Sequence, residues 1–143
     1  MFKDCHKLES INISHFYSQK SIYIDNMFSN CYNLKSLNLF NFKSQKISYL
    51  NNVFNNCSNL KSINIDNFDT QSVTSMNSIF YGCSSLESIN LSNINTKNVK
   101  YMNNLFEGCF NLTSIDLSNF DISNVYNLNS MFKDCHKLES III

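Results

Sequence analysis

The sequence predicts an α/β solenoid in which one short parallel strand and one short helix form each 26-residue coil. Two observations lead to this fold class. The same residue types return every 26 residues without insertion or deletion, and two hydrophobic periods alternate within each unit. A strict period of this length is typical of a solenoid, because each unit buries its apolar face on its neighbours. The 143 residues then make about five and a half coils of one domain, residues 1–143.

The repeat is easiest to follow through its cysteines. They stand 26 residues apart along the whole chain: Cys5, Cys31, Cys57, Cys83, Cys109 and Cys135. A phenylalanine lies three residues before each cysteine, and a leucine lies three residues after it. Such columns of identical residues predict coils that lie on one another, so that equivalent side chains stack.

Residues 86–91 and the equivalent residues of the other units predict a short strand. Leu86, Ile89 and Leu91 have the L-x-x-L-x-L spacing of a leucine-rich repeat, and the last two alternate with the period of a strand. Stacking would pair these strands into a parallel sheet on one side of the solenoid. A polar turn follows and ends at Ile94 or, in the other units, at a phenylalanine: Phe16, Phe42, Phe68 and Phe120.

The next segment changes period and predicts a short helix. Five apolar residues fall on one helical face: Val73, Met76, Ile79, Phe80 and Cys83. Asp69, Thr70 and Ser72 precede them and would cap the free N–H groups of the helix. Residues that tolerate a left-handed backbone stand where the helix should end: Asn30, Asn56, Gly82 and Gly108. In the first unit Ser21–Ile22 shifts the apolar position by one residue, which predicts looser helix packing there.

The two ends of the sequence are the same piece of the repeat. Residues 1–11 are identical to residues 131–141, and both ends interrupt a unit. Solenoids usually finish with polar capping units, and neither end has one. We therefore expect residues 1–143 to be a segment of a longer array, or a product of recombination between near-identical units.

Uncapped ends predict end-to-end self-association of the isolated 143-residue chain. Met1, Phe2 and the isoleucines at 141–143 would leave open strand edges, which pair readily with other chains. Light scattering at high protein concentration should detect particles heavier than a monomer. A monomer at every concentration would contradict this prediction.

Composition excludes several classes of protein. The net charge is zero and every basic residue is lysine, which argues against nucleic acid as a partner because phosphate binding needs clustered positive charge. No run approaches the roughly 18 apolar residues of a transmembrane segment. The first residues, Met1 to His6, contain no apolar stretch of a secretory signal.

The six cysteines predict buried free thiols. Their even number follows from the number of repeats, so it does not indicate a disulfide framework. Side chains that leave one ladder in parallel suit disulfide geometry poorly, although occasional bridges or oxidation remain alternatives. The absence of a Cys-x-x-Cys pair argues against zinc, and we expect no metal site.

The sequence predicts no enzyme and no cofactor. His6 and His136 occupy the same repeat position, and His15 replaces a repeated asparagine, so all three are interpreted as solvated polar residues. Neither a glycine-rich phosphate loop nor a Gly-x-Ser-x-Gly elbow is present.

The outward positions of the strands are the candidate binding site. With the leucines and isoleucines inward, two polar columns face solvent: Ser36, Asn38, Ser62, Asn64, Ser88, Asn90, Ser114 and Asp116. The neighbouring column mixes charge signs: Glu9, Lys35, Lys61, Glu87, Thr113 and Glu139. Either identical polar side chains hydrogen-bond along the ladder and stabilise stacking, or the regular face recognises a ligand. The two interpretations are compatible.

The repeat resembles the BspA-like leucine-rich repeats. The match is clearest from Ile79 to Met102 and from Leu105 to Leu128, where the Phe, Cys, Leu, Ser, Ile and Leu positions recur together. This family includes surface proteins and lipoproteins of bacteria, among them mycoplasmas, and of some parasitic protists. The resemblance implies display at the cell surface or secretion, and adhesion to a protein or glycan. It implies no catalytic residues.

Two other functions remain open at this point. The chain could be an intracellular repeat scaffold or spacer whose thiols stay reduced, or a remnant array without a function of its own. An export signal encoded upstream of Met1 would favour the surface protein, whereas a true start codon there would favour the scaffold.

Overall fold

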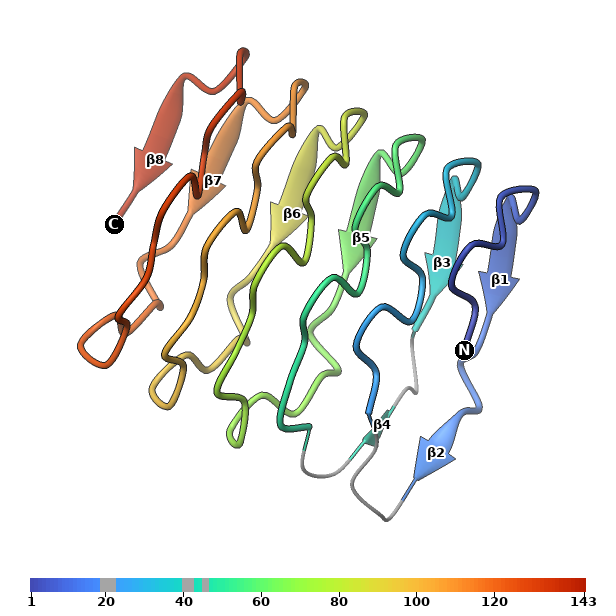
Figure 1. Ribbon diagram of the computed structural model, residues 1–143, viewed down its shortest axis with the longest axis horizontal. Coiled ribbons are helices and arrows are strands. Elements are labelled where there is room, and N and C mark those ends of the chain that lie inside the picture. The colour runs from blue at the N-terminus through green and yellow to red at the C-terminus, as the bar shows by residue number, and fades with distance from the viewer. Residues whose placement is uncertain (19–22, 40–42, 45–46) are drawn as a thin grey trace.

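The computed structural model describes residues 1–18, 23–39, 43–44 and 47–143. Its main sheet face consists of six three-residue strands: β1 (Ser10–Asn12), β3 (Ser36–Asn38), β5 (Ser62–Asn64), β6 (Ser88–Asn90), β7 (Ser114–Asp116) and β8 (Ser140–Ile142). Figure 1 shows these strands side by side, one to a coil. Two shorter strands, β2 (Tyr17–Ser18) and β4 (Lys43–Ser44), pair in parallel at the other end of the first two coils.

Strand pairing follows the repeat. β1 pairs with β3, β5 with β6 and β7 with β8, and every pair is parallel. Ile63 lies opposite Ile89, its equivalent in the next coil. The predicted solenoid of parallel strands is therefore confirmed. β3 and β5, like β6 and β7, are neighbours that belong to different two-stranded sheets.

The predicted helix is wrong, because the described residues contain no helix. Residues 77–82 instead form consecutive turns. Alternate N–H groups donate to carbonyls of the next coil, as in Met76 N to Tyr101 O (2.9 Å) and Phe80 N to Leu105 O (3.0 Å). The N–H of Cys83 closes a turn onto the carbonyl of Phe80 at 3.1 Å. These backbone bonds therefore tie each coil to the next on this side, including the places where the strands of neighbouring coils do not pair.

Left-handed residues account for the missing helix. Ser78 and Gly82 have φ angles of 55° and 68°, and Asn52 and Asn56 repeat the pair in the previous coil with φ of 57° and 58°. A right-handed helix cannot contain such residues in its interior. The left-handed backbone predicted at Asn30, Asn56, Gly82 and Gly108 is confirmed, although it belongs to turns and not to helix ends.

The expected capping residues also serve turns. Asp69 Oδ1 accepts from the N–H of Gln71 at 3.1 Å, and the carbonyl of Thr70 accepts from the N–H of Val73 at 3.0 Å. These contacts start a turn of the coil. The apolar residues after them still face inward, because the turns bring the same positions to the core that a helix would.

The core consists of columns of equivalent residues. Four phenylalanines are fully buried: Phe28, Phe54, Phe80 and Phe106. Their rings stack on one another, with centroid distances of 5.7, 5.7 and 5.4 Å and interplanar angles between 5° and 11°. A leucine column, Leu34, Leu60, Leu86 and Leu112, is buried beside them. The prediction that the phenylalanine positions form the core is thus confirmed.

The residues that end the polar turns join this core. Phe68 and Ile94 are buried, and Phe16 and Phe120 pack against the core while partly exposed. Phe42 and the shifted Ser21–Ile22 lie outside the described residues. In the described part of the chain, no helix is long and apolar enough to cross a bilayer.

Candidate functional site on the sheet face

The polar columns predicted on the strands lie where the sequence places them. Ser62 and Asn64 are exposed on β5, with Ile63 buried between them, and Ser88 and Asn90 lie opposite them on β6. The equivalent residues on β3 and β7 are exposed in the same way: Ser36, Asn38, Ser114 and Asp116. The alternation follows from the period of two of a strand with one buried face. These eight residues define the sheet face discussed below.

The asparagine column also shapes the backbone. Asn64 Oδ1 accepts from the N–H of Asp66 at 2.8 Å, and Asn90 Oδ1 accepts from the N–H of Ser92 at 3.0 Å. Asp116 Oδ1 makes the same bond with the N–H of Ser118 at 2.8 Å. A bond between a side-chain oxygen and the backbone N–H two residues later fixes the turn that ends each strand. At Asn64 and Asn90 the bonds that the side-chain oxygens accept therefore run into the following turn and not along the column.

The hydrogen bonds at Asp116 also set its charge. Ser118 donates to the Asp116 carboxylate from its side chain and from its backbone, and these bonds hold the pKa of that carboxyl below its usual range. Hydrogen bonds to the charged form of an acid favour that form. Asp116 is therefore ionised at neutral pH. Among the eight residues of the sheet face it is the one carboxylate.

Side-chain ladders between coils occur elsewhere, at positions that the sequence analysis did not single out. Asp25 Oδ1 accepts from the N–H of Asn51, Asn51 Oδ1 from that of Asn77, and Asn77 Oδ1 from that of Asn103, at 2.8, 3.1 and 3.2 Å. All four residues occupy one repeat position, and this column of polar residues was the signal in the sequence that could have predicted the ladder. This ladder links consecutive coils next to the turns, at a column for which the sequence analysis predicted no ladder.

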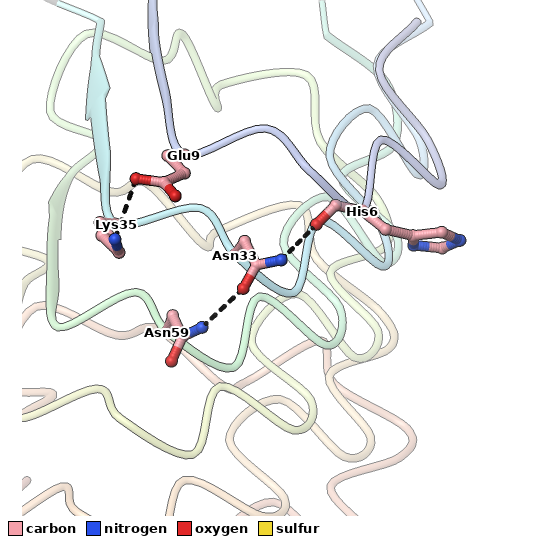
Figure 2. A network of polar contacts seen from close by, with 5 residues as sticks. All are labelled: His6, Glu9, Asn33, Lys35 and Asn59. Atoms are coloured by element: carbon pink, nitrogen blue, oxygen red, sulfur yellow. Dashed lines mark hydrogen bonds and ion pairs between the residues drawn. The ribbon is translucent and has the colours of Figure 1, made fainter.

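A second ladder crosses the loops that precede the strands. Figure 2 shows Asn33 Nδ2 donating to the carbonyl of His6 at 2.7 Å, and Asn59 Nδ2 donating to Asn33 Oδ1 at 3.3 Å. In the same view Lys35 Nζ lies 2.9 Å from Glu9 Oε2. This ladder joins the first three coils at their loops.

The charged column beside the strands pairs across coils. Lys35 bonds to Glu9, and Lys61 Nζ lies 3.4 Å from Glu87 Oε1. The four side chains are between 62% and 73% exposed, so each pair adds at most about 1 kcal/mol of stability. Their main effect is to leave the border of the sheet face nearly neutral.

The cysteines form a single file in the core. All six are free, and Cys31, Cys57, Cys83 and Cys109 are buried, whereas Cys5 is exposed and Cys135 is half-buried. Cys83 Sγ donates to the carbonyl of Phe54 at 3.1 Å, and Cys109 Sγ donates to that of Phe80 at 3.2 Å. The same bond recurs along the file. The prediction of buried free thiols is confirmed at the four inner positions.

The histidines lie on the surface. His6 Nδ1 is 2.9 Å from the carbonyl oxygen of Asn30, and its ring stacks on Tyr32 with centroids 5.1 Å apart. His136 stacks on Phe110 at 5.4 Å, and His15 is exposed. Among the described residues, His, Cys, Asp and Glu side chains form no group of three that could hold a metal ion.

One hollow opens on the sheet face. It has a volume of about 170 Å³ and lies where β3 and β5 are neighbours without strand pairing. Its lining combines two inward leucines with three amides: Leu37, Asn38, Leu39, Asn64 and Asn67. Two of the predicted site residues, Asn38 and Asn64, therefore meet at one concave point.

One family of known proteins matches the repeat over most of the chain. The family described as "Mycoplasma protein of unknown function, DUF285" matches residues 1–62 and 48–142. The chain belongs to the DUF285 family. No curated protein matches the sequence. The DUF285 chain is a repeat protein whose strand motif has leucine-rich-repeat spacing.

A solved structure resembles the DUF285 chain distantly. It is the crystal structure of a leucine-rich repeat protein from Bacteroides ovatus ATCC 8483, with 18% sequence identity and a TM-score of 0.35. The similarity covers 94% of the DUF285 chain and 42% of the other. The chain thus spans less than half of that protein, and a similarity this distant supports no statement about function.

Proposed function

We propose that this DUF285 chain is a non-enzymatic, surface-associated module that binds a protein or glycan ligand through its sheet face. The hollow between β3 and β5 carries the proposal. Its 170 Å³ is smaller than the roughly 300–1,000 Å³ of small-molecule pockets, and it is lined by amides and leucines. It suits one side chain or one sugar ring of a larger ligand that lies across the strands.

The surroundings of the hollow support a macromolecular ligand. Serine and asparagine rows offer hydrogen-bond donors and acceptors along several coils, and the Lys–Glu pairs beside them leave little net charge. An extended polar surface of this kind is how solenoids commonly bind partners. The resemblance to BspA-like repeats implies the same adhesive role at a cell surface.

Lysines placed on the sheet face should abolish binding without unfolding the chain. Ser62→Lys with Ser88→Lys adds bulk and charge within the serine row and leaves the turns at Asn64 and Asn90 intact. Binding to a panel of immobilised extracellular-matrix proteins and glycans would be measured by surface plasmon resonance. We expect at least a tenfold loss of affinity, a loss typical of a central contact.

The matched control is Gln71→Lys with Ser72→Lys, which adds the same charge at two exposed positions away from the strands. It should bind as the parent does, and both double variants should keep the parent's melting temperature. Full binding by the Ser62→Lys, Ser88→Lys variant would reject the sheet face. A panel without any ligand would reject the adhesive function.

A further inference from the structure

Four exposed tyrosines lie away from the sheet face, on the other side of the coils. Tyr23, Tyr49, Tyr101 and Tyr126 are 84%, 43%, 44% and 77% exposed, and we call them the tyrosine strip. The first three share one repeat position. Parallel bridges join Tyr49 to Ser75 and Ser75 to Tyr101, so these residues form one row across three coils. The rings of Tyr101 and Tyr126 lie 6.3 Å apart.

The row has a polar gap between two rings. Ser75 occupies the middle rung and is buried, and its hydroxyl donates to Asn51 Oδ1 at 2.6 Å. Asn77 Nδ2 donates in turn to Ser75 Oγ at 3.1 Å. Tyr49 and Tyr101 therefore flank a small side chain, with rungs about 4.8 Å apart along the solenoid. The result is a row of aromatic groups separated by hydroxyls and amides.

The strip carries almost no charge. Residues 47–51, 73–77, 99–103 and 125–129 contain one charged side chain, that of Lys100. Next to Tyr23 stands one carboxylate, Asp25, which accepts from the N–H of Asn51 at 2.8 Å. A basic peptide would find a single carboxylate there, that of Asp25, and one of its oxygens already accepts a backbone N–H. A single-stranded nucleic acid also stacks on aromatic rings, but it needs a positively charged groove. The charge distribution thus favours an uncharged ligand.

We propose that the tyrosine strip binds a neutral polysaccharide. The C–H faces of sugar rings pack on aromatic rings, and sugar hydroxyls bond to phenol, serine and asparagine groups. A polysaccharide repeats its ring at a regular interval, as the strip repeats its rungs. Tyrosine supplies a large contact area and a polar tip with little loss of conformational entropy. This site is independent of the sheet face and of the ligand proposed there.

Affinity electrophoresis tests the strip with defined probes. The 143-residue chain would be run in native gels that contain laminarin, barley β-glucan, xylan or galactomannan. We expect at least one polysaccharide to retard the parent. Tyr49→Ala with Tyr101→Ala should weaken that binding about tenfold or more, as loss of aromatic anchors does. Tyr49→Phe with Tyr101→Phe keeps both rings and should retain most of the retardation.

The control uses aromatic residues of another column. Tyr32 and Phe110 are 41% and 46% exposed in the loops before the strands, so Tyr32→Ala with Phe110→Ala should migrate as the parent. The Ser62→Lys, Ser88→Lys variant should also be retarded, which separates the strip from the sheet face. Circular dichroism would confirm that each variant is folded.

Three outcomes would overturn the proposal. They are free migration of the parent in all four gels, equal retardation of the parent and the Tyr49→Ala, Tyr101→Ala variant, and tyrosine-dependent binding of a peptide without binding of any polysaccharide.

Discussion

Replacement of Phe80 by alanine is expected to lower the free energy of unfolding by about 3–5 kcal/mol. The ring is 1% exposed and stacks between Phe54 and Phe106, with centroids 5.7 and 5.4 Å away. Its removal leaves a cavity in the middle of the aromatic column, and the backbone bonds from coil to coil resist collapse of the coils into that space. Urea unfolding followed by far-UV circular dichroism measures the loss.

Phe110 provides the matched control. Its side chain is 46% exposed, and its ring stacks on that of His136 with centroids 5.4 Å apart. Phe110→Ala should therefore cost less than about 1 kcal/mol, as surface substitutions usually do. Similar losses for the two variants would show that burial in the column is not what stabilises the fold.

The stacking order could be predicted from the sequence because a strict period leaves one consistent register. Each Cys, Phe and Leu recurs after the same number of residues, so only a shift by whole coils aligns all three columns. The pairing of Ile63 with Ile89 follows directly. The inward direction of Ile89 and Leu91 and the exposure of Asn90 between them follow from strand alternation.

The backbone between the strands could not be predicted from hydrophobic spacing alone. Met76, Ile79, Phe80 and Cys83 face inward whether the chain forms a helix or two successive turns. The distinguishing signal was the pair of residues four positions apart, Ser78 and Gly82, that tolerate φ above zero. Equivalent pairs recur in four other units, from Asn26 and Asn30 to Ser130 and Asp134. Only the second member of a pair was interpreted, as a helix end.

The candidate site was predictable in position but not in all its contacts. Exposure of the serine and asparagine columns follows from the strand period. Use of the Asn64 oxygen in a turn depends on backbone geometry after the strand, which composition does not reveal. The tyrosine strip was missed because Ser75 and Asn127 interrupt the tyrosine at that repeat position, so the column does not look aromatic in the sequence.

Stability should fall steeply above about pH 9 because the inner thiols are buried. Burial raises the pKa of Cys57 to about 12 and raises the pKa values of Cys31, Cys83 and Cys109 as well. Unfolded thiols have a pKa near about 8.5. Above that pH the unfolded chain loses protons that the folded chain keeps, so stability decreases as pH rises towards the folded pKa. Below it both states hold these protons, and the contribution does not change.

The slope of this pH dependence is proportional to the number of thiols that stay protonated in the folded chain. A thiol that stays protonated in the folded chain contributes about 1.4 kcal/mol per pH unit, so the three with the largest shifts, Cys57, Cys83 and Cys109, together give up to roughly 4 kcal/mol per unit. The raised pKa values of Cys31 and Cys135 act in the same direction. Urea unfolding under reducing conditions at pH 7, 8, 9 and 10 measures the slope. Cys83→Ala should make it shallower by about 1.4 kcal/mol per unit. A Cys83→Ala slope equal to that of the parent would mean that the file of thiols is not protected from ionisation by the fold.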